Sequence, residues 1–77
     1  MVETHGSAAA LTRLLDEVVD LLKQPSVGME LGRRGVNTSI ALIATQGLIA
    51  YIEGNRIRAA DDLGTAAEEI EARSERR

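Results

Sequence analysis

The stretch NTSIALIATQGLIAYIEGN, residues 37–55, decides the fold of this chain. From Ile40 to Ile52 only the triplet at 45–47 interrupts the apolar residues. The polar residues just before this run are competent helix caps. The pattern predicts a helix over residues 38–53.

The predicted helix 38–53 carries a single narrow polar stripe. Ser39, Gln46 and Glu53 are spaced seven residues apart, so they fall on one line of a helix. A helix that is apolar around the rest of its circumference is normally buried on most sides. We interpret the stripe as a solvent edge; the alternative is a set of buried polar groups that fixes the register of a symmetric interface.

A strand is the competing interpretation of this stretch, because β-branched residues favour sheets and residues 53–56 could form a tight hairpin turn. Strict alternation is absent, however, and Ala41, Ala44, Gln46 and Ala50 are poor strand residues. These residues favour a helix.

The same apolarity raises the question of a membrane span. The run from Ile40 to Ile52 has 13 residues, whereas roughly 20 are needed to cross a bilayer. Thr45 and Gln46 also interrupt its centre. We therefore expect no membrane span.

Toward the N-terminus, apolar residues recur at three- and four-residue steps and charges occupy the opposite face, as in an amphipathic helix. Ser7 is a candidate N-cap, and Pro25 is expected to end the helix because it disfavours helical backbone at the preceding residue. The pattern predicts a helix over residues 8–23. Its apolar stripe consists of Leu11, Leu14, Leu15, Val18, Leu21 and Leu22.

Between these two helices, Gly28, Gly32 and Gly35 fall within residues 25–36. So many glycines free the backbone to adopt positive φ and break the helical pattern. We expect this segment to be a glycine-rich joint.

A third helix is predicted over residues 57–73, where acidic residues come early and basic residues late, as the helix dipole favours. Gly64 is expected to weaken the middle of this helix by about 1 kcal/mol relative to alanine; the alternative is that it permits close backbone contact with the helix 38–53. Residues 1–7 and 74–77 are expected to be flexible. The apolar stripe of this helix consists of Ile57, Ala60, Leu63, Ala67 and Ile70.

The spacing from Ala50 to Ala67 resembles the second half of a tetratricopeptide-type hairpin. Tyr51, the turn Gly54-Asn55 and Ala59 fall close to that family's aromatic, turn and small-residue positions, as does Ala66. The likeness covers about a quarter of the chain, and there is no second copy, whereas stacked repeats need roughly three. It implies an antiparallel helical hairpin joined at Gly54-Asn55 and assigns no family.

The composition limits what one copy achieves alone. A chain of 77 residues is one domain, 1–77, and buries only roughly 60% of the surface that it exposes unfolded. There is no cysteine, so neither disulfides nor thiolate metal sites add stability. The net charge of −3 argues against nucleic-acid binding, since nucleic-acid-binding domains are normally basic. No signal peptide is visible, and the expected location is cytoplasmic.

Few residues are candidates for chemistry. His5, the single histidine, is expected to be a disordered surface residue. Arg33 and Arg34, flanked by Gly32 and Gly35, are a candidate anion site, because free backbone N–H groups before a helix attract anions. The carboxylates of residues 57–73 are interpreted as a solvated face. We predict no catalytic residue, no cofactor and no metal site.

The sequence thus predicts an all-α fold, a three-helix chain that assembles into an oligomeric bundle. A homodimer is favoured and a tetramer is the alternative, with a protein partner as a further option. The expected function is a non-catalytic oligomerisation or protein-interaction module, an accessory subunit or adaptor. The alternative is a small regulator that binds an anion or nucleic acid through Arg33 and Arg34. The predicted interface consists of Ile40, Ala41, Ile43, Ala44, Gly47, Leu48, Tyr51 and Ile52.

Overall fold

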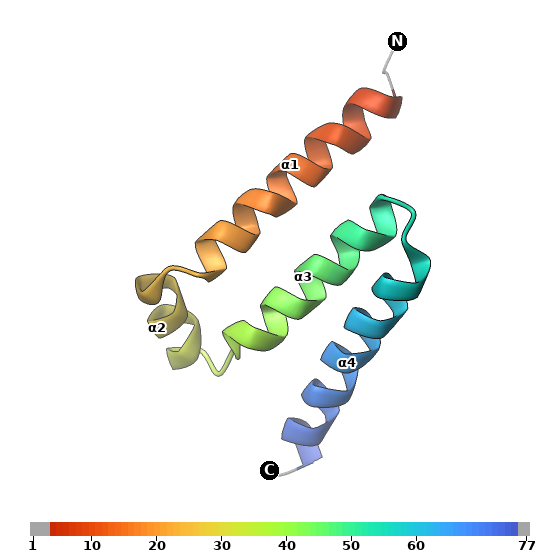
Figure 1. Cartoon of the computed structure of the whole chain (residues 1–77). Coiled ribbons are helices and arrows are strands. Elements are labelled where there is room, and N and C mark those ends of the chain that lie inside the picture. Colours follow the sequence, from red (N-terminus) through yellow and green to blue (C-terminus); the bar gives the residue numbers. More distant parts are fainter. Residues whose placement is uncertain (1–3, 76–77) are drawn as a thin grey trace.

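The computed structural model describes residues 4–75, with side chains from Gly6 to Ser74, and this part of the chain is all helical. The all-α prediction is confirmed. The four helices are α1 Thr4–Leu22, α2 Pro25–Arg33, α3 Thr38–Ile52 and α4 Arg56–Glu75 (Figure 1).

The prediction of three helices is wrong because part of the expected joint, Pro25–Arg33, is the helix α2. Pro25 lies in its first turn, where the missing N–H costs nothing, so the same proline that ends α1 also begins α2. Gly28 and Gly32 lie inside this helix at a cost of about 1 kcal/mol each relative to alanine.

Two helix boundaries also differ from expectation. α1 begins at Thr4, so Ser7 lies within the helix and is not its N-cap. α4 extends to Glu75. Residues 4–7 and 74–75 are therefore helical, while residues 1–3 and 76–77 of the tails predicted to be flexible lie outside the described part.

The turns before and after α3 share two features, a glycine with positive φ and an asparagine that caps the next helix. Gly35 and Gly54 have φ of +80° and +90° and end α2 and α3 in the left-handed conformation that glycine adopts readily. After each glycine, an asparagine side chain caps the next helix. The Oδ1 of Asn37 accepts a hydrogen bond from the N–H of Ile40 at 3.1 Å, and the Oδ1 of Asn55 accepts one from the N–H of Arg58 at 3.1 Å.

The long helices form an open layer with α3 in the middle (Figure 1). α1 and α4 pack on opposite sides of α3, both antiparallel to it, and they do not touch each other within the described residues. A closed three-helix bundle would bring each helix against both others. Here α3 has neighbours on two sides and leaves two sides without a helix.

The closest packing in the layer is between α3 and α4 at Gly47. A β-carbon built on Gly47 would lie 2.9 Å from Cγ of Leu63 and 3.0 Å from Cβ of Asp62. Gly64, the alternative candidate for this role, has no atom within 4 Å of such a carbon, so that alternative is wrong. The hairpin likeness did place small residues here correctly, since Ala59 and Ala66 are both buried.

The resulting core is small for the length of the chain. Among the side chains from Gly6 to Ser74, the buried apolar residues are Ile40, Ala50, Ala59 and Ala66, and no large side chain is fully buried. The chain exposes 5959 Å², about 1,400 Å² more than a compact monomer of its mass. Its radius of gyration is 14.2 Å, against about 11.5 Å for a compact domain of this length. The layer is thus extended and incompletely covered.

The two glycines make a matched pair of substitutions. We expect Gly47→Ala to lower the free energy of unfolding by about 1–3 kcal/mol, because the added methyl group overpacks the α3–α4 contact. We expect Gly64→Ala to raise it by about 0.5–1 kcal/mol, because this exposed helical site has room for a methyl group. Urea unfolding followed by circular dichroism measures both, and a Gly47→Ala variant as stable as the parent would contradict the close approach.

Candidate interaction surface

The two broad sides of the layer differ in polarity, and the polar side is defined by a shallow hollow of about 190 Å³. Asp16 of α1, Gln46 and Glu53 of α3 and Arg58 of α4 lie around it. Ser39 and Glu53 of the predicted polar stripe are exposed and Gln46 is half-buried, as expected for a solvent edge. Polar residues from all three long helices thus face the same side.

On the other side, α1 presents a stripe of exposed leucine and valine. In the isolated chain, 58% of Leu14 is exposed. The steps of three, four and three residues match the a and d positions of a heptad, the pattern by which helices pair. The stripe lies about half a turn around α1 from Asp16, so it points away from the polar hollow. We call it the α1 seam: Leu11, Leu14, Val18 and Leu21.

The sequence alone does not distinguish the α1 seam from the other apolar residues of the predicted stripe. The six apolar residues of the predicted stripe span too wide an arc for one helix to cover. Leu15 and Leu22, together with Val19, are half-buried at the positions that face α3, while the other four remain exposed. The width of this stripe was the sequence signal for an exposed seam, because one neighbouring helix covers only a narrower apolar stripe.

The eight predicted interface residues of α3 do not share one environment. Ile40 and Gly47 are buried, and Ile43 is half-buried on the same arc of the helix. This arc packs against α4 of the same chain, so Gly47 is explained without a second molecule. Ile52 is half-buried near the α1 side.

The remaining four predicted residues lie about half a turn from the polar stripe, on the same side of the layer as the α1 seam. Leu48 and Tyr51 are exposed there, Tyr51 to 61%, and the two alanines that precede them along α3 are half-buried. We call this the α3 row: Ala41, Ala44, Leu48 and Tyr51.

α4 completes this side with smaller residues, its α4 row: Ala60, Leu63, Ala67 and Ile70. Near its end, Ile70 and Arg73 border a groove of about 450 Å³ together with Val36, Ile40 and Ala44. The α1 seam, the α3 row and the α4 row together form what we call the open apolar face. This face draws residues from all three long helices.

The structure places Arg33 and Arg34 at the C-terminal end of α2, whereas the sequence had them leading into a helix. The backbone N–H groups that follow are not free: those of Arg34 and Val36 donate to the carbonyl of Leu31, and that of Gly35 donates to Gly32. Arg34 also contacts Glu30 at 3.4 Å. The first turn of α3 is capped by Asn37. The geometry expected for an anion site is therefore not present in this segment.

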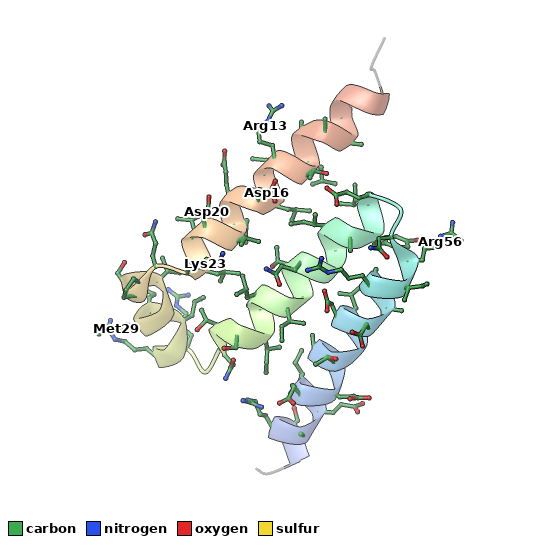
Figure 2. All side chains as sticks on the ribbon, in the orientation of Figure 1. Arg13, Asp16, Asp20, Lys23, Met29 and Arg56 are labelled. Carbon is green, nitrogen blue, oxygen red and sulfur yellow. The ribbon has the colours of Figure 1, made fainter. Side chains whose placement is uncertain are left out.

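In Figure 2 the charged side chains of Arg13 and Asp20 on α1 point away from α3. On α4, Arg58 pairs with Asp62 at 3.5 Å and Arg73 with Glu69 at 2.9 Å. His5 lies within α1. Among the described residues, no three histidine, aspartate or glutamate side chains gather in a cluster that could hold a metal ion.

Within residues 4–75, no helix has both the length and the apolarity to cross a bilayer alone; α2 and α3 together meet those criteria but are bent by 109°. Comparison with protein-family models, curated proteins and solved structures finds no match to this chain. The candidate function therefore depends on the geometry of the open apolar face.

The cap at Asn37 and the two arginines before it are expected to differ in their contribution to stability. Asn37→Ala should lower the free energy of unfolding by about 1 kcal/mol, because it removes the cap of α3. Replacing Arg33 and Arg34 by alanine should change it by less than about 0.5 kcal/mol, because an exposed ion pair contributes little. Denaturant titrations of the two variants distinguish these outcomes, and a larger effect from the arginines would mean that they make contacts beyond Glu30.

Proposed function

We propose that this protein is a non-catalytic helical interaction module that pairs with a second copy of itself through its open apolar face. The observation that carries the proposal is the two-sided layer: polar residues face one side, and three helices present apolar rows on the other. Monomeric soluble proteins rarely expose contiguous apolar patches larger than a few hundred Å², and larger ones mark interaction sites.

The exposed area supports a partner of about the same size. The chain exposes about 1,400 Å² more than a compact monomer of its mass. A standard protein interface buries about 800 Å² on each partner, and obligate dimers bury more. A second copy supplies an equal apolar face, and twofold pairing is the commonest way in which one chain covers such a surface.

A non-catalytic role is in keeping with the residue types of the chain. Histidine is the usual general base of enzymes and cysteine is the usual thiol nucleophile. The chain has one histidine and no cysteine. The two hollows in the layer are lined mainly by apolar side chains or by residues of the polar edge. Apolar burial is the interaction that this surface offers most.

The mass of the protein in solution tests the proposal. We expect the chain to sediment as a dimer at tens of micromolar, and Leu48→Glu to weaken association about 100-fold or more, because the carboxylate would be buried at the pairing surface. Gln46→Glu, on the polar side, is the matched control and should leave the dimer intact. Circular dichroism checks that both variants remain helical. A parent chain that sediments as a monomer at 100 µM, a concentration chosen to favour pairing, would overturn the proposal.

Tyr51 offers an independent measurement, because it is the only aromatic residue and belongs to the α3 row. We expect acrylamide to quench its fluorescence more strongly on dilution, as the dimer dissociates and the ring becomes accessible. In Leu48→Glu the quenching should be strong at every concentration. Quenching that is independent of concentration in the parent chain would mean that Tyr51 is not covered by a partner.

A further inference from the structure

The α3 row has its small residues at one end and its large residues at the other. The first half of α3 carries Ala41 and Ala44, and the second half carries Leu48 and Tyr51. Ala44 and Leu48 each lie two residues from Gln46 along the helix. Ala41 and Tyr51 each lie five residues from it. The row is therefore complementary in size to an antiparallel copy of itself that is centred at the level of Gln46.

Two twofold arrangements bring a second copy onto the open apolar face, and they differ in what faces the α3 row. With the axis across the helices at the level of Gln46, the two α3 helices run antiparallel. Leu48 then lies over the partner's Ala44, and Tyr51 lies over the partner's Ala41. With the axis along α3, each residue faces its own counterpart, so the two tyrosines meet while the two alanine ends face each other across a gap. Only the axis across the helices places large residues opposite small ones.

The groove between α3 and α4 lies where the first arrangement needs space. Ala41 and Ala44 border this groove of about 450 Å³ together with Ile70 of α4. Tyr51 is seven residues from Ala44, so it lies on the same arc of α3, on the side toward α4. An axis across the helices keeps the α4 side of one copy over the α4 side of the other. The partner's Tyr51 therefore comes over the groove at the level of Ala41.

The chemistry of the groove fits a tyrosine side chain. Its walls are apolar, and Asn37, Arg73 and Ser74 also border it. A tyrosine has an apolar ring and a hydroxyl group that usually finds a hydrogen-bond partner when the ring is buried. In the isolated chain 61% of Tyr51 is exposed. The groove thus offers apolar contact to the ring and polar groups to the hydroxyl.

The charges of α4 also favour the antiparallel arrangement. A β-carbon built on Gly47 would lie 2.9 Å from Cγ of Leu63, so an axis at the level of Gln46 crosses α4 close to Leu63. The first turn of α4 has no acidic residue, and its Arg56 points away from α3 (Figure 2). Glu68 and Glu71 are exposed in the second half of α4. Antiparallel α4 helices bring the basic start of each copy toward the acidic second half of the other, and opposite charges attract.

We propose that two copies pair about a twofold axis that crosses α3 at the level of Gln46, and that Tyr51 of each copy fills the groove between α3 and α4 of the other. This inference rests on the proposed function, because it specifies how the two copies meet. The same axis lays the two α1 helices antiparallel on one flank and the two α4 helices antiparallel on the other. The dimer then contains two identical tyrosine–groove contacts.

Cross-linking tests the arrangement directly, because the chain has no cysteine. We expect a short bismaleimide to link Ala41→Cys to Tyr51→Cys when the two variants are mixed, one of them carrying a tag that shifts its mass. The mixed dimer keeps one tyrosine–groove contact intact. Neither variant should link to itself, because the ten-residue spacing separates identical positions by about 15 Å along α3. An axis along α3 gives the opposite result, in which both variants link to themselves.

A size swap at the same two positions supplies a second readout. We expect Ala41→Leu to weaken association about 10-fold or more, because the larger side chain takes the space of the partner's Tyr51. Tyr51→Ala should also weaken it about 10-fold or more, because it empties the groove. The double variant again places a large residue opposite a small one, so it should associate more tightly than either single variant. With an axis along α3, Ala41→Leu fills a gap and strengthens association.

Met29 supplies the matched control for the loss of a large exposed side chain. It is exposed to 64%, close to the value for Tyr51, and it points away from α3 (Figure 2). Met29→Ala should therefore leave the dimer unchanged. Circular dichroism checks that every variant remains helical, and each cysteine variant is cross-linked at a concentration at which it sediments as a dimer.

Sedimentation of the parent chain separates the possible failures. A monomeric parent chain overturns the proposed function and this inference together. A dimer in which either cysteine variant links to itself, in which the mixed pair does not link, or in which Ala41→Leu strengthens association overturns the inference and leaves the proposed function standing. A dimer with the mixed link alone, weakened by Ala41→Leu and recovered in the double variant, supports it.

Discussion

The contact between α3 and α4 at Gly47 is the constraint on which the rest of the structure depends. A glycine on one helix receives Leu63 and Asp62 of the other, and Ala50, Ala59 and Ala66 are buried along the same contact. Small residues let the helix axes approach closely, but each of them removes little apolar area from water. The hairpin is therefore tightly packed and yet leaves most of the large apolar side chains outside the core.

The long helices were predictable from the sequence because a pattern with helical spacing marks each of them. The segments around Leu15 and Leu63 repeat their apolar residues with that spacing, the segment around Ile43 repeats its few polar residues every seven positions, and each of the three is a helix. α2 was missed because Gly28 and Gly32 lie inside it, and glycine counts against a helix from propensity alone. Its geometry is set by Pro25 at one end and Gly35 at the other, which are boundary signals that can belong to a joint as well as to a short helix.

The candidate surface was only partly predictable for a different reason. The apolar residues around most of α3 showed that this helix is buried on several sides. They do not show which arc of the helix is buried by the same chain. Gly47 and Ile40 face α4, whereas Leu48 and Tyr51 remain outside, and only the arrangement of the helices separates these pairs. The α1 seam is the clearest case, because its exposure follows from α1 having a single long neighbour.

The order of contacts along the chain has a consequence for how the molecule folds. α3 and α4 are joined by a tight turn, so their contacts are local in sequence and need little loop closure. Among the three long helices, α1 is held by the fewest contacts and only through half-buried residues, so it opens at a lower free energy than the α3–α4 hairpin. In the proposed dimer the last helix to dock also contacts the other copy. Folding of α1 and assembly would then be a single cooperative step, with the α3–α4 hairpin as its template.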